Sequence, residues 1–393
     1  MSAAPRIRRI TAALALLVAV GAAAWRAPRP VVSDFVTTST AVAALAPKPP
    51  ALHHVPVAPL ADDFLPRVAP TAHGASLVAL ADGDVAAAWF AGSREGAPDV
   101  SIYLSRWHAV GRGGVWSAPV AVATREGVQA ATGRYVRKLG NPVLGQDSDG
   151  RLHLWFVSVA FGGWAGSALN HQVSEDGGLT WSGAQRLVTS PFLNISTLVR
   201  NPPLWPDHGG GVALPVYHEF IAKHGEWLRL DDQGRVVDKV RLPQPRRALQ
   251  PAVAPLGNGE LLALLRDAGP GPGHVLSATS PDGGAHWQAG APLPIANPNA
   301  AVALLRLTNG SLLLACNPVP GNRNRLSLWL SPDQGANWRE VQVLDASDDG
   351  DDEFSYPALA QDSAGRIHVV YTWKRETLRH HVFAANALQE SRP

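Results

Sequence analysis

Polar residues of several kinds follow an apolar stretch in the first third of the chain. Residues 85–90 are expected to form a strand, and Ser93, Arg94, Glu95 and Asp99 then lie in a loop before the next strand begins. A guanidinium binds anionic groups through two parallel hydrogen bonds, and a carboxyl group can exchange a proton. A binding site for an anionic ligand is therefore expected at this strand end.

The elements that must position this loop are indicated by a repeated turn. The pattern Ser-x-Asp-x-Gly-x-x-Trp occurs at 174–181, 280–287 and 331–338. Its Asp can accept backbone N–H bonds, its second Gly can adopt a positive φ, and its Trp can pack between neighbouring units. The recurrence predicts a repeated structural unit.

A second repeat gives the number of units. Asn- or Asp-rich turns with Gly lead into apolar runs at intervals of about 50 to 65 residues, the size of a four-stranded propeller blade. We therefore expect an all-β, six-bladed β-propeller of four-stranded blades; an open β-sandwich is the alternative. The six turns lie around Gly83, Gly150, Gly210, Gly259, Gly310 and Gly365.

The N-terminal part differs from the rest. Residues 1–25 combine three arginines with an apolar run, which is typical of a cleaved signal peptide or an N-terminal anchor. Residues 26–60 are rich in Pro, Ala and Val and are expected to be a linker, and 61–393 should form the propeller. The protein is therefore expected to be exported, either periplasmic or secreted, with possible membrane attachment through this segment.

The charge balance and the cysteine content limit the kinds of partner and cofactor that are expected. Lys and Arg number 34 against 32 Asp and Glu, a net charge of +2, which argues against nucleic acid as a partner. Cys316 is the single cysteine and is expected to be a small buried residue. Neither a phosphate-binding glycine loop nor zinc-ligand spacing occurs, so no cofactor or metal is expected. The acidic run 348–353 could be a solvated loop, a loose Ca²⁺ site or an acidic wall near Tyr356.

Together, the repeated turn and the loop of Arg94 resemble the sialidase superfamily, and more closely its BNR-repeat branch. In that family the turn is called the Asp-box and joins the two outer strands of a blade. The resemblance implies that Arg94 contacts the sugar and that Asp99 is the acid/base residue. The structural alternative for Asp99 is a cap on its turn.

Three later segments extend the resemblance. One is similar to a family segment with a substrate-binding arginine, which would be Arg266 here; its sequence is LQPAVAPLGNGELLALLRD. Another is similar to a segment with a further substrate-binding arginine, which would be Arg323; its sequence is NRNRLSLWLSPDQGANW. The last resembles the strand that carries the nucleophile, which would be Tyr356; its sequence is EFSYPALAQDSAGRIHVVYTW. Guanidiniums can fix a sugar carboxylate and lower the pKa of a tyrosine. The structural alternatives are an ion pair between Arg266 and Asp267, an exposed turn for Arg323, and a core position for Tyr356.

The chain also departs from the family. Gln250 stands where the family has a Glu that polarises the nucleophile, and His73 lies in the stretch where the family has another Arg. Glu219, in the candidate pocket rim 217–219, could substitute for the missing Glu. Lys138 and Arg200 could add positive charge to the pocket.

These observations predict an exported glycoside hydrolase that removes a terminal sialic acid or related acidic sugar from an acidic oligosaccharide or glycoconjugate. Two alternatives stay open. One is a polysaccharide lyase, in which arginines neutralise a uronate carboxylate while His73 or His218 acts with Tyr356. The other is a propeller that binds acidic glycans without turnover.

Overall fold

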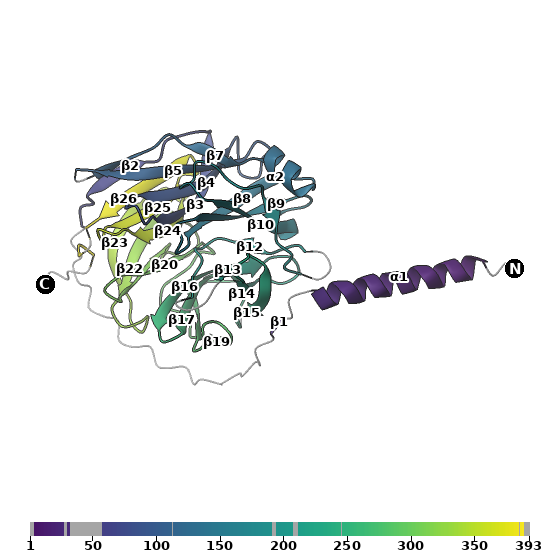
Figure 1. Cartoon of the computed structure of the whole chain (residues 1–393). Coiled ribbons are helices and arrows are strands. Elements are labelled where there is room, and N and C mark those ends of the chain that lie inside the picture. Colours follow the sequence, from purple (N-terminus) through teal and green to yellow (C-terminus); the bar gives the residue numbers. More distant parts are fainter. Residues whose placement is uncertain are drawn as a thin grey trace.

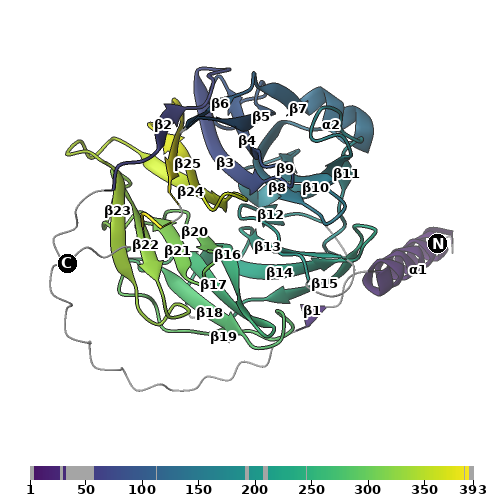
Figure 2. The same ribbon diagram turned by 60° about the vertical axis from the view of Figure 1, so that its left-hand side comes forward.

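Six antiparallel sheets surround a central axis and form a β-propeller (Figures 1 and 2), as predicted. The computed structural model describes residues 4–26, 30–31, 57–111, 113–190, 194–206, 211–244, 246–384 and 386–388. Figure 2 shows β8, β12, β16, β20 and β24 gathered around the middle, with β6, β11, β19 and β23 toward the periphery.

Consecutive strands build the first five blades. Blade 1 contains β3 (Thr71–Ala79), β4 (Val85–Gly92), β5 (Ser101–Val110) and β6 (Gly113–Trp116), with β7 (Val120–Ala123) also paired to β5. Blade 2 contains β8 (Lys138–Gln146), β9 (Leu152–Val159), β10 (Ser167–Ser174) and β11 (Gln185–Arg186). Blade 3 contains β12 (Leu198–Val199), β13 (Val212–His218), β14 (His224–Leu230) and β15 (Val236–Arg241), and β1 (Pro30–Val31) pairs with β15 in parallel. Blade 4 contains β16 (Ala248–Gly257), β17 (Glu260–Asp267), β18 (Leu276–Ser280) and β19 (Gln288–Ala289). Blade 5 contains β20 (Ala303–Arg306), β21 (Leu312–Cys316), β22 (Arg325–Ser331) and β23 (Arg339–Ala346).

The sixth blade closes the ring with a strand from the other end of the propeller sequence. It contains β24 (Phe354–Gln361), β25 (Ile367–Trp373) and β26 (Thr377–Phe383), and its outer strand is β2 (Ala61–Phe64). Ala61 pairs with Val382 in an antiparallel register. Because the closing strand comes from residues 61–64, the first and last parts of the propeller are held together by a backbone ladder.

The predicted glycine turns connect the first and second strands of the blades. Five of these glycines have positive φ angles, between 79° and 93°, a conformation that glycine adopts without a Cβ clash. They are Gly83, Gly150, Gly259, Gly310 and Gly365. Gly210 lies outside the described residues, although β12 and β13 on either side of it are paired as expected.

The repeated Ser-x-Asp-x-Gly-x-x-Trp turn joins the third and fourth strands of blades 2, 4 and 5, as expected. In blade 4 the Gly284 N–H donates to Ser280 Oγ at 2.9 Å and the Trp287 indole donates to the Gly284 carbonyl at 3.1 Å. A Cβ on Gly284 would lie 2.2 Å from Trp227 Nε1 in blade 3. The turn therefore packs one blade directly against its neighbour.

Apolar side chains fill the spaces between blades. One cluster combines Leu264 of blade 4 with Leu314 and Cys316 of blade 5, all fully buried. Cys316 is thus the small buried residue that was expected, and burial raises the pKa of its thiol.

The helices lie outside the blades. α1 (Ala4–Arg26) projects away from the propeller (Figure 1) and comprises most of the segment that is predicted to be a signal peptide or an anchor. No helix in the described parts of the chain is long and apolar enough to cross a membrane. Most of the predicted linker, 26–60, lies outside the described residues. α2 (Arg125–Thr132) and the 3₁₀ turn η1 (Trp164–Gly166) belong to the loops of blades 1 and 2.

Candidate active site

Inner strands of three blades begin with the same backbone irregularity. Asn141, Gln250 and Tyr356 have φ angles of 48°, 53° and 54° and interrupt the pairing of β8, β16 and β24 with a bulge. Each is followed by a proline, which lacks an N–H for the ladder and is tolerated at bulges. β3 has a comparable bulge after His73, at Gly74. Positive φ at a residue other than Gly is uncommon and concentrates at functional sites.

Tyr356 lies in a cationic environment. Arg266 Nη1 donates to the Tyr356 hydroxyl at 3.2 Å, and the Arg323 guanidinium carbon lies 5.6 Å from the centre of the Tyr356 ring. Burial raises the pKa of the Tyr356 phenol, but the charges of Arg266 and Arg323, together with a hydrogen bond to Gln250, outweigh burial and bring the pKa below its ordinary value. The phenolate is therefore easier to form here than in solution.

Gln250 connects Tyr356 to a buried polar cluster. Arg266 Nη1 donates to Gln250 Oε1 at 3.1 Å, and Gln250 Nε2 donates to the Tyr217 hydroxyl at 3.3 Å. Asn141 Nδ2 donates to the same hydroxyl at 2.9 Å, and burial raises the pKa of Tyr217. The neutral amide of Gln250 thus fixes the Arg266 guanidinium without neutralising it.

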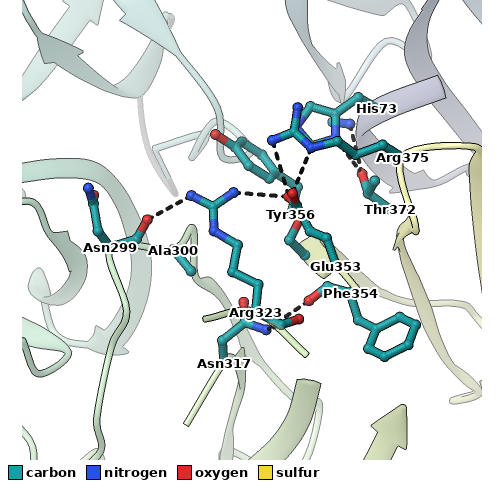
Figure 3. A network of polar contacts seen from close by, with 12 residues as sticks. His73, Asn299, Ala300, Asn317, Arg323, Glu353, Phe354, Tyr356, Thr372 and Arg375 are labelled. Atoms are coloured by element: carbon teal, nitrogen blue, oxygen red, sulfur yellow. Dashed lines mark hydrogen bonds and ion pairs between the residues drawn. The ribbon is translucent and has the colours of Figure 1, made fainter. Parts of the chain in front are cut away.

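A chain of alternating charges lies beside Tyr356 (Figure 3). Arg323 donates to Glu353 Oε1 at 3.0 Å and to the Asn299 carbonyl at 2.8 Å. Arg375 donates to Glu353 Oε2 at 2.6 Å and to Glu95 Oε2 at 2.6 Å. Burial alone would raise the pKa of Glu353, but its hydrogen bonds and the two arginines lower it to about 2. Glu353 stays ionised and holds both guanidiniums in place.

A buried arginine lies beneath the Tyr356 ring. Arg200 is 2% exposed, and its guanidinium carbon lies 5.3 Å from the ring centre. Arg200 donates to the backbone carbonyls of Ala75 at 3.1 Å and Pro357 at 2.9 Å, and burial lowers its pKa to about 10. Its contacts join blades 1, 3 and 6 at the axis.

His73 packs against the candidate nucleophile. Its ring centre lies 4.3 Å from that of Tyr356, and Nδ1 lies 2.9 Å from Thr372 Oγ1. Burial lowers the pKa of His73 to about 4, so the ring is neutral near pH 7. Thr372 Oγ1 accepts from the Gly74 N–H and can donate to Nδ1, which places the ring proton on Nε2. Nε2 is buried and has no partner among the described residues.

A cavity of about 420 Å³ lies beside Tyr356 rather than around it. His73, which packs against Tyr356, lines it together with Glu95 and Arg375, and Arg94 lines it from the loop after β4. Lys138 and Trp164 form part of its wall in blade 2. Its volume is in the range of small-molecule sites.

Tyr356, Arg266, Arg323, Gln250 and His73 come together, although they belong to strands and loops of four blades. Asp267 does not pair with Arg266; its buried carboxylate contacts Arg246 Nε at 2.8 Å.

Asp99 and Glu219 lie further out. Asp99 is exposed and accepts hydrogen bonds from Ser93 N and Ser93 Oγ, both at 2.9 Å, which is the turn-capping arrangement; these bonds lower its pKa. Glu219 is half-buried near Tyr217, and its charge adds to the effect of burial in raising the Tyr217 pKa. The carboxyl group of the Arg94 loop that lines the cavity is that of Glu95.

Arg375, Thr372 and Asn299 were not predicted. Thr372 lies at the end of the apolar strand β25, and Arg375 follows it. Polar residues at the end of an apolar strand are also the signal by which Arg94 was predicted. Asn299 has a φ of 57°, and no sequence pattern marks it. Glu353 belongs to the acidic run 348–353, and its position beside Arg323 supports the acidic-wall interpretation of that run. No group of metal-ligating side chains was found in the described parts of the chain.

The fold and this cluster define a six-bladed propeller with arginines and a tyrosine at one end of its axis. Residues 83–369 match the BNR repeat-like domain family model, and the chain belongs to that family. No curated protein matches the sequence.

Solved structures with the same fold are distant in sequence. The chain is similar to the Hadza microbial sialidase Hz136, with 17% identity and a TM-score of 0.66, covering 81% of this chain and 66% of that one. It is also similar to the NanB sialidase of Streptococcus pneumoniae, with 12% identity and a TM-score of 0.64, covering 85% and 71%. A protein of unknown function from Dyadobacter fermentans has 16% identity and a TM-score of 0.63, covering 83% and 98%. The chain spans just under two thirds of the length of Hz136.

Proposed function

We propose that this protein is a glycoside hydrolase that removes a terminal sialic acid or a related acidic sugar from an acidic oligosaccharide or glycoconjugate. The observation that carries the proposal is the Tyr356 hydroxyl, 3.2 Å from Arg266 in a strand bulge at the propeller axis, with Arg323 beside its ring. Sialidases with this fold among the solved structures support it.

The charges favour an acidic sugar. Arg266 contacts the Tyr356 hydroxyl and Arg323 lies 5.6 Å from the ring centre, and guanidiniums bind carboxylates with well-defined geometry. A carboxylate nucleophile would be repelled by a substrate that carries a carboxylate beside the reacting carbon. A tyrosine is neutral before the reaction, and the arginines that hold the substrate also stabilise its phenolate.

The reaction then has two balanced steps. In the first, the Tyr356 phenol releases its proton to solvent water, its oxygen bonds to the anomeric carbon, the glycosidic C–O bond breaks, and a general acid protonates the leaving oxygen. In the second, water replaces the tyrosine on that carbon and gives one proton to the same carboxylate, while the departing phenolate regains a proton from solvent. Gln250 cannot accept the phenolic proton as a Glu would, so we assign the activation of Tyr356 to Arg266 and Arg323.

The general acid is a carboxyl group of the loop after β4. Asp99 matches the family position, whereas Glu95 lines the cavity. Asp99→Asn and Glu95→Gln distinguish the two, because loss of the acid impairs substrates with poor leaving groups far more than aryl glycosides. Equal activity of each variant and the wild type on both substrate types would leave the loop without a catalytic role.

The test of the function is mass spectrometry of products after the full-length protein is incubated with sialylated and uronate-containing oligosaccharides. Release of a terminal acidic sugar with gain of one water supports hydrolysis. Saturable binding without any product would replace the proposal with the non-catalytic alternative.

The lyase alternative rests on His73. Its neutral ring lies 4.3 Å from the Tyr356 ring and its buried Nε2–H has no partner among the described residues, so a Tyr356 phenolate could remove the C5 proton and return it to the leaving oxygen, with the Nε2–H as a hydrogen-bond donor. In the same experiment, cleavage of a uronate chain without gain of water would identify a lyase.

We propose that the protein is exported, to the periplasm or to the medium, and that residues 1–25 are either removed or retained as an anchor. Mass spectrometry of the N-terminus of the protein recovered from each cell fraction tests this proposal. A mature N-terminus after residue 20 in the extracytoplasmic fraction supports cleavage, and a cytoplasmic protein with an intact N-terminus contradicts export.

A further inference from the structure

The cavity beside Tyr356 carries two cations to which the two steps of the proposed reaction assign no role, and one of them, Arg94, is expected from the family resemblance to contact the sugar. Lys138 is the first residue of β8, and Arg94 lies in the loop after β4; both line the cavity. Neither forms an ion pair within the described residues, in contrast to Arg323 and Arg375, which contact Glu353. The two cations are therefore available to an anionic ligand.

The structure holds the Lys138 ammonium at this wall. Its Nζ lies 4.0 Å from the centre of the Trp164 ring, a cation–π contact. A Cβ on Gly140 would lie 2.5 Å from Trp164, so the glycine leaves the space in which the indole sits. A Cβ on Gly96 would lie 3.3 Å from Lys138 Nζ. Two glycines thus give room to this pair, and a long flexible side chain is kept in one place.

The cavity is placed to receive the second sugar of a substrate. His73 lines it and also stacks against Tyr356, and Arg375 links its wall to Glu353. Tyr356, Arg266 and Arg323 are not part of its lining. A ligand with its terminal sugar at Tyr356 would reach this cavity at His73, and Lys138 and Trp164 belong to the same lining.

We propose that this cavity is a subsite for the sugar attached to the terminal acidic sugar, and that Lys138 and Arg94 bind a carboxylate or sulfate on that second sugar. The substrate class is then a glycan with two adjacent acidic sugars. Trp164, whose ring carries the Lys138 ammonium, adds apolar surface to the same wall. This inference rests on the proposed function, since it takes the terminal sugar to lie at Tyr356.

The test compares two substrates that differ in the charge of the second sugar: sialyllactose, in which it is neutral, and an α2,8-linked disialyl oligosaccharide, in which it carries a carboxylate. Wild-type protein should prefer the disialyl substrate. Lys138→Met should reduce this ratio of kcat/KM values about tenfold to a hundredfold, the range of one charge-assisted hydrogen bond. The preference should also decrease with added salt.

Two variants serve as controls. Lys138→Arg keeps the charge and should keep most of the preference. Lys223→Met removes a lysine from the turn between β13 and β14, outside the cavity lining, and should leave the ratio unchanged. An equal loss on both substrates in Lys138→Met would overturn the proposal, because Lys138 would then contact the terminal sugar.

Calorimetry separates this proposal from the proposed function. If neither substrate is cleaved, hydrolysis is wrong, and the subsite is judged by binding alone. Tighter binding of the disialyl than of the monosialyl glycan, lost in Lys138→Met, supports the subsite without turnover. Equal affinities, or no binding of either glycan, reject it.

Discussion

The turns between the outer strands and the bulges of the inner strands both recur from blade to blade. The turns share side chains, whereas the bulges share a backbone conformation. The turns of blades 2, 4 and 5 repeat the side chains Ser, Asp, Gly and Trp and the hydrogen bonds between them. The bulges of β8, β16 and β24 repeat a backbone shape and a following proline, while the residue at positive φ changes from Asn to Gln to Tyr.

This difference separates packing from chemistry. A turn that must fit the neighbouring blade needs the same side chains each time, because interiors are closely packed. A bulge that directs one side chain toward the axis can carry any residue, so the blades can contribute different groups to one site. Substitutions in the bulges should therefore change activity, and substitutions in the turns should change stability.

The largest effect is expected for Tyr356→Phe. Loss of the hydroxyl removes the proposed nucleophile and should reduce kcat/KM for an acidic glycoside about a thousandfold or more, with an unchanged circular dichroism spectrum. Tyr135→Phe alters an exposed tyrosine, 56% accessible, and should have wild-type activity. A Tyr356→Phe enzyme with more than about a tenth of wild-type activity would refute the assignment.

Arg266→Met should have the next largest effect. The variant lacks the positive charge that we propose pairs with the substrate carboxylate and that lies beside Tyr356. We expect kcat/KM to decrease about a hundredfold. Because Arg266 lowers the pKa of Tyr356, the variant should also shift the pH profile that depends on this phenol to higher pH. Arg306→Met, on the exposed end of β20, is the matched control. A loss confined to protein yield would assign Arg266 a structural role.

Gly284→Ala tests the turn side of the comparison. The new methyl group would lie 2.2 Å from Trp227 Nε1, and we expect a loss of about 2 to 3 kcal/mol in the free energy of unfolding measured with urea. Gly283→Ala is the control within the same turn, since its Cβ would meet nothing within 4 Å. It should cost about 1 kcal/mol, because only its φ of 68° is unfavourable. Similar losses for both variants would show that backbone strain dominates. The folded fraction of each should retain wild-type kcat/KM.

Buried neutral histidines at the axis and within a blade give a smaller, pH-dependent effect on stability. Burial lowers the pKa of His73 at the axis to about 4 and that of His171 within blade 2 to about 3, from 6.5. The unfolded chain therefore binds more protons between pH 6.5 and about 4, so stability should decrease as pH falls through this window. His171→Gln should reduce the difference in unfolding free energy between pH 7 and 5 by about 2 kcal/mol. An unchanged difference would mean that the pKa of His171 is the same in the folded and unfolded chains.

Much of the fold could be predicted because its signals are local. The glycine turns and the Ser-x-Asp-x-Gly-x-x-Trp turns depend on residues within eight positions, and their spacing alone gave six blades. The pairing of β2 with β26 could not be predicted in the same way, since the two strands are separated by the whole propeller and no periodicity connects them.

The site was predictable only in part. Arg94, Arg266 and Tyr356 could be proposed from motifs because each lies at a strand end or in a recognisable segment. The contacts of Arg375 with Glu353 and Glu95 join the turn after β25 to the loop after β4, and no local pattern encodes them. Asp99 and Glu95 are four residues apart, yet only Glu95 lines the cavity, because Ser93 holds the Asp99 carboxylate in the turn.

The sequence by itself determined the blade architecture and the kinds of chemistry available, because turn conformation and strand periodicity are set by neighbouring residues. Only the tertiary structure decided which charges are neutralised. Arg323 is paired with Glu353, Arg200 is buried against backbone carbonyls, and Lys138 and Arg94 face a cavity. The physical reason is that the strength of a charge depends on burial and on partners from other blades, and both are fixed only when the ring closes.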